Sequence, residues 1–276
     1  MSKVPMSRVQ IHEHGFIELL DVMASDEDIE SAARVSYTGG DDEERTVGQR
    51  RHLIRYLMRH YHTTPFEMAV MKFRVALPIF VERQMIRHRT ASTNEFSGRY
   101  AEMPDLFFCP TPERIRKQSK LNKQGSADES LEDPQSWVNG FKFETGESRA
   151  NYKDRLHFGM AKELSRINLP LSQYTVKVWK MDLHNLLHFL RLRLHPHAQE
   201  EIRDYADPIA KMVAQHFPLT WEAFEDYRLH AVTFSRIEME VVRDFMNARN
   251  VEDHPSFSAL SQRERREFLG KLGVGE

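Results

Sequence analysis

Hydrophobic and polar positions alternate near the N-terminus, and this pattern predicts two short strands within residues 9–23, joined by a turn at Gly15. The segment 68–81 ("MAVMKFRVALPIFV") alternates in the same way and is rich in Val and Phe, so part of it is expected to be a strand. Residues 172–183 ("SQYTVKVWKMDL") are strand-like or irregular. The chain therefore contains a few strands.

Elsewhere, apolar residues recur every three or four positions, which predicts amphipathic helices. The first begins with a Ser/Asp cap and an acidic first turn, and another follows Pro78. The helical segments are 25–37, 43–62, 79–89, 152–169, 184–194, 198–217 and 219–229. The balance is mainly helical.

Residues 111–150 break this pattern, because they mix Pro, Ser, Gly, Lys and Glu with scattered apolar side chains. Such a composition predicts an insertion, a lid or a partly disordered loop, centred on 115–150. The basic segment 229–276 is expected to be a peripheral tail. We expect residues 1–276 to form a single domain.

Composition narrows the function classes. The formal net charge of −2 argues against a general binder of nucleic-acid polymers, which needs excess Lys and Arg. The single cysteine, Cys109, cannot form an internal disulfide. The N-terminus has no apolar core typical of a signal peptide, and no apolar run approaches membrane-spanning length. These features predict a cytoplasmic protein with no membrane association.

The stretch 83–100 ("RQMIRHRTASTNEFSGRY") concentrates fixed hydrogen-bond donors. On a helix, Gln84, Arg87 and His88 lie three or four positions apart and project toward one side. The helix is followed by residues that favour turns, and such loops often carry binding residues. The planar guanidinium of arginine suits phosphate oxygens. A solvent-exposed basic helix end followed by a polar loop would give the same pattern.

A second candidate lies in 184–201 ("HNLLHFLRLRLHPHAQEE"). His184 and His188 at i, i+4, with His195 and His197, could bind zinc, although Asn185 stands where the zincin motif requires Glu. Arg193 lies among leucines and therefore needs a ligand or an acidic partner such as Glu200 or Glu201.

Other chemistry is less strongly indicated. Cys109 follows two phenylalanines and precedes a proline, which suggests a buried, structural thiol. The chain has no G-x-G-x-x-G and no G-x-x-x-x-G-K-[ST], so neither a Rossmann nor a P-loop nucleotide site is predicted.

The segment 87–100 resembles the signature of the flavin-dependent thymidylate synthases: Arg87-His88-Arg89, seven residues, then Ser97. Five other segments are similar to family segments in the same order, and the resemblance covers about residues 16–228. They are "AARVSY" (32–37), "HTTPFE" (62–67), "PIFVERQ" (78–84), "INLPLSQYT" (167–175) and "LRLRLHPHAQEEI" (190–202).

The resemblance implies an α+β fold, mainly helical with a small mixed or antiparallel sheet. It implies conversion of dUMP to dTMP, with the carbon from methylenetetrahydrofolate and the electrons from NADPH through FAD. Reduced flavin would deliver hydride without a cysteine nucleophile and without a metal. It also implies a homotetramer whose active sites are shared between subunits.

Site residues carried over from the family fall into two sets. Residues implied to contact FAD are Thr64, Arg87, His88, Arg89, Glu95, Asp182, Leu183, His184 and His188, with Ser36 as a further candidate. Residues implied to contact dUMP are Gln84, Met85, Ile86, Arg87, Glu95, Phe96, Ser97, Gly98, Arg99, Arg166 and Arg193.

The chemistry of these residue types agrees with that assignment. Several arginines would neutralise the phosphates, and backbone N–H groups of Phe96, Ser97 and Gly98 could add donors. Arg193 is the predicted catalytic group, which would stabilise negative charge developing on the uracil ring. Two other functions stay open from the residues alone: a zinc hydrolase using His184, His188 and His197, and an RNA-binding protein that uses the basic loop as an anion clamp.

Overall fold

The fold was analysed in a computed structural model, which describes residues 8–38, 45–120, 123–246, 257 and 260–272. The chain divides into two compact units, residues 1–229 and residues 230–276. All candidate site residues named above belong to the first unit.

The first unit is built on a five-stranded sheet in which every described pairing is antiparallel. The strands, in spatial order, are β1 (Arg8–Ile11), β2 (Gly15–Met23), β3 (Val70–Pro78), β7 (Tyr174–Asp182) and β4 (Ser92–Glu95). A separate hairpin consists of β5 (Arg116–Gln118) and β6 (Ser126–Ser130).

Helices make up most of the remaining described residues. In the first unit they are α1 (Asp26–Thr38), α2 (Val47–Arg59), α3 (Thr64–Glu67), α4 (Ile79–Met85), α5 (Pro134–His157), α6 (Lys162–Ser165), α7 (Leu183–Arg193), α8 (Glu200–His216) and α9 (Pro218–Phe224), with the short turns η1 (Pro112–Arg114), η2 (Arg166–Asn168) and η3 (Glu225–Leu229). The second unit contains α10 (Arg236–Met246) and α12 (Gln262–Leu272).

The core lies on the sheet face covered by α7 and α8. Strand alternation turns Phe73 and Val75 of β3 inward while Lys72 and Arg74 point to solvent. Trp179 of β7 packs against Phe73 at 6.0 Å between ring centroids, and against Phe189 of α7 at 5.3 Å. These aromatic contacts fix α7 against the sheet.

The turn predicted at Gly15 lies at residues 12–14, and Gly15 is the first residue of β2. A Cβ at Gly15 would lie 2.1 Å from the hydroxyl oxygen of Tyr205, which no side chain can tolerate. Tyr205 is buried, and its hydroxyl donates to the Ala76 carbonyl oxygen at 2.9 Å. This hydrogen bond ties α8 to β3, and Gly15 of β2 lies directly against the same hydroxyl.

Most sequence predictions of helices and strands are confirmed, including the mainly helical α+β class with a small antiparallel sheet. Two segments differ from the prediction. Residues 134–150, expected to belong to an insertion, a lid or a partly disordered loop, form most of α5, and the helix expected over 152–169 is divided among the end of α5, α6 and η2. Residues 92–95, expected to be part of a loop, form β4 and pair with β7. Their turn-favouring side chains are exposed, and the edge of β7 supplies the backbone partners.

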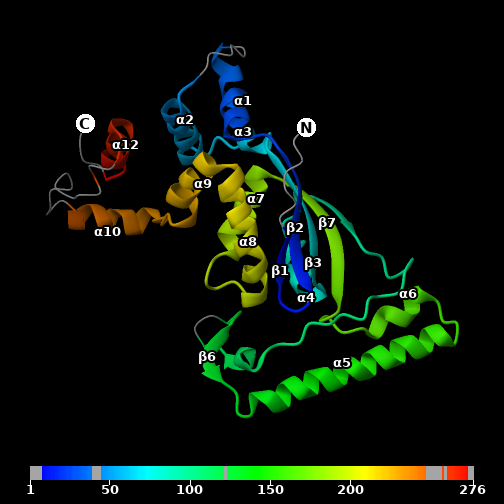
Figure 1. The fold of residues 1–276 in the computed structure, drawn as a ribbon. Coiled ribbons are helices and arrows are strands. Elements are labelled where there is room, and N and C mark those ends of the chain that lie inside the picture. The colour runs from blue at the N-terminus through cyan, green and yellow to red at the C-terminus, as the bar shows by residue number, and fades with distance from the viewer. Residues whose placement is uncertain (1–7, 39–44, 121–122, 247–256, 258–259, 273–276) are drawn as a thin grey trace. The chain divides into compact units, whose positions relative to one another are not determined.

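The segment 115–150 contains the β5–β6 hairpin and most of α5, a helix of 24 residues (Figure 1). Residues 121–122 lie outside the described part. Whether this segment acts as an insertion or a lid stays a prediction, as does the single domain.

The described part of the second unit contains two helices, α10 and α12. Arg243 of α10 donates to the backbone carbonyl oxygen of Lys271 in α12, and the rings of Phe257 and Phe268 lie 6.4 Å apart. Residues 247–256, 258–259 and 273–276 of the predicted tail are outside the described residues. The peripheral role of 229–276 stays a prediction.

No helix among the described residues is long and apolar enough to cross a membrane. The cytoplasmic location stays a prediction.

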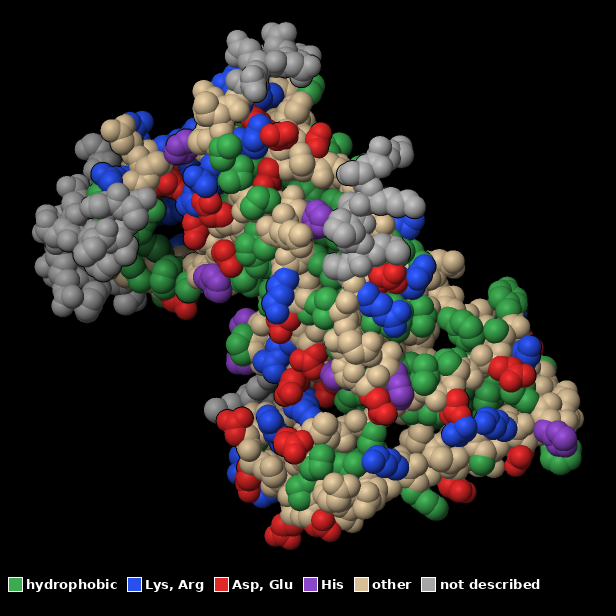
Figure 2. Space-filling view, in the orientation of Figure 1, with side chains coloured by type: hydrophobic (Ala, Val, Ile, Leu, Met, Phe, Trp, Pro, Cys, Tyr) green, Lys and Arg blue, Asp and Glu red, His purple; other side chains and the backbone are tan. Residues whose placement is uncertain are grey.

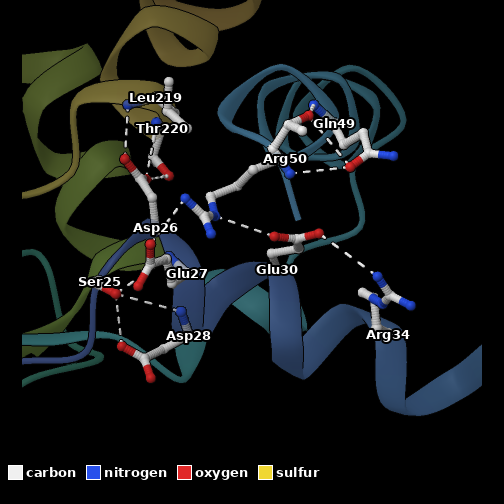
Figure 3. A network of polar contacts seen from close by, with 11 residues as sticks. Ser25, Asp26, Glu27, Asp28, Glu30, Arg34, Gln49, Arg50, Leu219 and Thr220 are labelled. Carbon is white, nitrogen blue, oxygen red and sulfur yellow. Dashed lines mark hydrogen bonds and ion pairs between the residues drawn. The ribbon is translucent and has the colours of Figure 1, made fainter. Parts of the chain in front are cut away.

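A buried carboxylate joins the start of α1 to the start of α9 (Figure 3). Asp26 accepts hydrogen bonds from the backbone N–H groups of Leu219 (2.8 Å) and Thr220 (3.1 Å), and from the Thr220 hydroxyl (2.7 Å). Nearby, Arg50 of α2 pairs with Glu30 at 3.1 Å and with Glu27 at 3.0 Å. Asp26 therefore caps a helix far away in sequence and joins α1 to α9, while Arg50 joins α2 to α1.

We expect Asp26→Ala to lower the free energy of unfolding by about 2 kcal/mol, because it leaves buried donors of α9 without an acceptor. Chemical denaturation measures this change. Asp28→Ala is the matched control, since Asp28 is exposed and bonds only to Ser25 nearby. Equal losses for the two variants would contradict the capping role.

Candidate active site

Three predicted residues meet where α4 and α7 end. Nε of Arg193 donates to Nε2 of His88 at 3.1 Å, and a terminal nitrogen of Arg193 donates to the Gln84 carbonyl oxygen at 3.3 Å. The Gln84 side chain is held in turn by Gln199 at 2.5 Å. We call Gln84, His88 and Arg193 the arginine–histidine cluster.

Electrostatics keep His88 neutral. Burial, followed by the positive charges of Arg193 and His188, lowers its pKa from 6.5 to about 4. A neutral imidazole that accepts through Nε2 carries its proton on Nδ1. Burial also lowers the pKa of Arg193, so its guanidinium is partly removed from water.

A second group forms around the turn that follows β4. A Cβ at Gly98 would lie 2.5 Å from Sδ of Met103 and 3.0 Å from Cδ of Arg166, so Arg166 lies directly against this turn. Arg99 approaches Glu163 at 3.7 Å. We call Ser97–Arg99 with Arg166 the turn cluster.

The backbone donors of this turn differ from the sequence prediction. The N–H of Phe96 donates to the Val176 carbonyl oxygen at 2.8 Å, so it is not available to a ligand. The cause is β4, whose pairing with β7 continues past Glu95. Ser97 and Gly98 donate no backbone hydrogen bond to a described residue.

Two adjoining cavities hold further predicted residues. One, of about 620 Å³, is lined by Ser36 and Thr64; the other, of about 150 Å³, is lined by His184 and His188. They share Leu57, His62 and Thr63 in their walls.

Two arginines line the smaller cavity. Arg191 and Arg228 join its histidines, and no carboxylate of the described residues lines it. Burial lowers the pKa of His188, and the charges of His184, Arg191 and Arg193 lower it further. Positive groups gathered without a counter-ion favour an anionic ligand.

Sequence reasoning missed part of this wall. His62 lies in the family-like segment 62–67, and Arg191 shares a helix face with His184 and His188, but neither was assigned as a site residue. Nothing in the sequence indicated Arg228, whose guanidinium lies 3.6 Å from the ring centroid of Tyr61.

Other predicted residues are placed less directly. The side chains of Met85 and Leu183 are fully buried in the core, so only their backbone atoms could contact a ligand. Asp182 caps α7 by accepting from the Asn185 backbone N–H at 2.9 Å. Arg87, Arg89 and Ile86 are exposed.

The clusters stay separate within one chain. Among the described residues, no hydrogen bond or ion pair joins the arginine–histidine cluster to the turn cluster. No three His, Cys, Asp or Glu side chains of the described residues are placed to hold a metal ion. The zinc arrangement of His184, His188 and His197 therefore finds no support there.

Comparison with known proteins gives the family. Residues 18–219 match the family model described as "Thymidylate synthase complementing protein". The chain is 44% identical over 268 residues to the flavin-dependent thymidylate synthase of Wolbachia pipientis wMel, which covers 95% of this chain and 91% of the relative. The chain belongs to the flavin-dependent thymidylate synthase family. The family enzyme of Thermus thermophilus is 45% identical over 269 residues, 97% of each chain.

A solved structure agrees with this family assignment. The UMP/dUMP methylase PolB from Streptomyces cacaoi, bound with 5-Br dUMP, is similar with a TM-score of 0.73 and 36% identity, over 80% of this chain and 99% of that chain. As a member of the flavin-dependent thymidylate synthases, the protein is an enzyme. The hydrolase and RNA-binding alternatives lose their support.

His88 gives a pH-dependent prediction. The pKa of His88 is about 4 in the folded protein and 6.5 in the unfolded chain. Between pH 6.5 and pH 4 the unfolded chain therefore binds a proton at His88 that the folded protein does not. The free energy of unfolding consequently falls as the pH is lowered through this range. In Arg193→Ala, loss of the neighbouring charge should raise the pKa of His88. NMR titration of the imidazole measures it.

Arg191→Ala, on the same helix, is the control, since Arg191 is not among the charges that shift His88. If the pKa of His88 responded equally to both substitutions, its direct coupling to Arg193 would be wrong.

Proposed function

We propose that this enzyme converts dUMP to dTMP, taking the carbon from methylenetetrahydrofolate and the electrons from NADPH through FAD. The observation that carries the proposal is the arginine–histidine cluster, in which Arg193 is partly desolvated and held at two points by uncharged acceptors. Family membership and the similarity to PolB, which was solved with a dUMP analogue, support it.

The residues present suit FAD. The two cavities combine hydroxyl side chains, Ser36 and Thr64, with the hydrogen-bonding and basic side chains of His184, His188 and Arg191. A diphosphate joined to planar rings fits such a donor set. Arg87 and Arg89 of the loop after α4, and Glu95 at the end of β4, would complete the contacts. When bound, FAD supplies the hydride that turns the transferred carbon into a methyl group.

The protein's own part is to bind and polarise the nucleotide. Arg193 would lie at the uracil edge and stabilise the negative charge that develops on the ring. Gln84, fixed by Gln199, would set the position of the base. Arg99 and Arg166, with the N–H groups of Ser97 and Gly98, would hold the phosphate.

No cysteine nucleophile is needed on this route. Cys109 is partly buried, its thiol lies 3.9 Å from the Val138 carbonyl oxygen, and burial raises its pKa. A thiol with a raised pKa is a poor nucleophile near neutral pH, because little of it is ionised.

A homotetramer with shared sites would bring the separate clusters together. The segment of α5, α6 and η2 exposes large apolar side chains, and such surfaces are usually covered by a partner (Figure 2). Among them are Phe143 (70% exposed), Phe158 (85%), Ile167 (70%) and Leu171 (62%). The partner we propose is a second copy of this chain.

Turnover by purified protein tests the proposal. We expect a yellow protein that forms dTMP from dUMP only when methylenetetrahydrofolate and NADPH are both present. UMP belongs in the same assay, because PolB is described as a UMP/dUMP methylase. Equal methylation of UMP would overturn dUMP as the specific substrate, and a colourless protein would overturn the FAD assignment.

Arg193→Ala should lower kcat by about 100-fold or more while flavin stays bound, because one preformed donor to developing charge is lost. Single-turnover formation of dTMP and the flavin absorbance measure the two effects. Cys109→Ala is the control and should keep most activity. An inactive but folded Cys109→Ala variant would reinstate a thiolate route.

A further inference from the structure

An ion pair is buried between α4 and β7. Nζ of Lys177 in β7 lies 2.5 Å from a carboxylate oxygen of Glu82 in α4. The two side chains are only 1% and 5% exposed. Charges this deep are rare, because burial removes their hydration.

Glu82 and Lys177 differ in the charged groups near them. Apart from Lys177, no described donor hydrogen-bonds to either carboxylate oxygen of Glu82. Burial lowers the pKa of Lys177, whereas the charges of Glu82 and Glu95 raise it. Burial also raises the pKa of Glu82, and the Glu95 charge adds to that rise. Two carboxylates therefore act on one ammonium group.

Strand register explains why Glu95 takes part. Glu95 of β4 is directly opposite Lys177 in the β4–β7 pairing, so both side chains project to one face of the sheet. Thr175, two residues before Lys177 and on the same face, donates its hydroxyl hydrogen to Glu95 at 2.8 Å. Glu95 is exposed, and it makes no direct ion pair with a described cation.

We propose that Lys177 and Glu82 are positioning residues for Glu95. The ion pair with Glu82 keeps the Lys177 ammonium group on the buried face of the sheet. Its charge attracts the Glu95 carboxylate, but the two groups do not form a direct ion pair. Glu95 is then held on Thr175 with a second carboxylate oxygen facing the ligands. This inference rests on the proposed function and on the contacts of Glu95 with FAD and dUMP that the family resemblance implies.

A purely structural pair would only tie α4 to β7, and paired substitutions separate the two roles. In Glu82→Leu/Lys177→Met both charges leave together, so the melting temperature should stay close to that of the parent protein. The KM for dUMP should nevertheless rise about tenfold, the equivalent of a modest loss of one charged contact, with a smaller change in kcat. Lys72→Met, on the solvent face of β3, is the control and should change neither value.

A Glu95→Gln background shows whether the effect passes through Glu95. There, removing the pair should raise the KM for dUMP no further. Additive effects in that background, or a double variant with parental KM and flavin content, would overturn the proposal. The parent enzyme's dTMP formation in the same assay tests the proposed function separately.

Glu82→Gln covers the case in which the double variant does not fold, because it keeps the side-chain volume. It frees Lys177 to pair directly with Glu95, so the KM for dUMP should rise and flavin retention should fall. Lys177→Arg keeps the charge and should retain more dUMP affinity than Lys177→Met. An unchanged KM in Glu82→Gln would also overturn the proposal.

Discussion

The antiparallel pairing of β3 with β7 is the constraint on which the candidate site depends. Their register runs from Val70 opposite Asp182 to Pro78 opposite Tyr174. Helix α4 leaves β3 at Pro78, and α7 leaves β7 at Asp182, so the helices begin at opposite ends of the strand pair. Both return along the covered face, and their C-terminal ends meet at the arginine–histidine cluster.

Aromatic packing against the sheet fixes the position of α7 relative to His88. Phe189 of α7 contacts Trp179 of β7 and also lies 4.9 Å from the His88 ring. One aromatic side chain thus connects the core to the site. Movement of α7 along the sheet would displace Arg193 and His88 together, which links the stability of the core to the geometry of the site.

The sequence predicted the helices and strands better than it predicted the contacts between them. Apolar periodicity located α7 and α8 to within two residues, because those helices bury a continuous stripe. It failed for residues 92–95, where polar, turn-favouring side chains form a strand only because β7 offers an unpaired edge.

The contacts of the site residues were also hard to predict, because they too depend on segments that are distant in the sequence. The resemblance supplied residue identities, and the structure gathers Gln84, His88 and Arg193 in one place. No periodicity could show that the Phe96 N–H is used by the sheet, or that Lys177 faces inward at a position where its strand buries apolar residues. Those facts depend on strand register, which is a property of distant segments.

The way Arg193 is held has a consequence for its electrostatic strength. Arginines inside proteins are commonly fixed by Asp or Glu, and such a partner cancels most of the field that the cation projects. Here the anchors are an imidazole nitrogen and a peptide oxygen, neither of which carries a formal charge. The guanidinium is therefore immobilised while its full unit of positive charge remains directed at whatever occupies the space beside it.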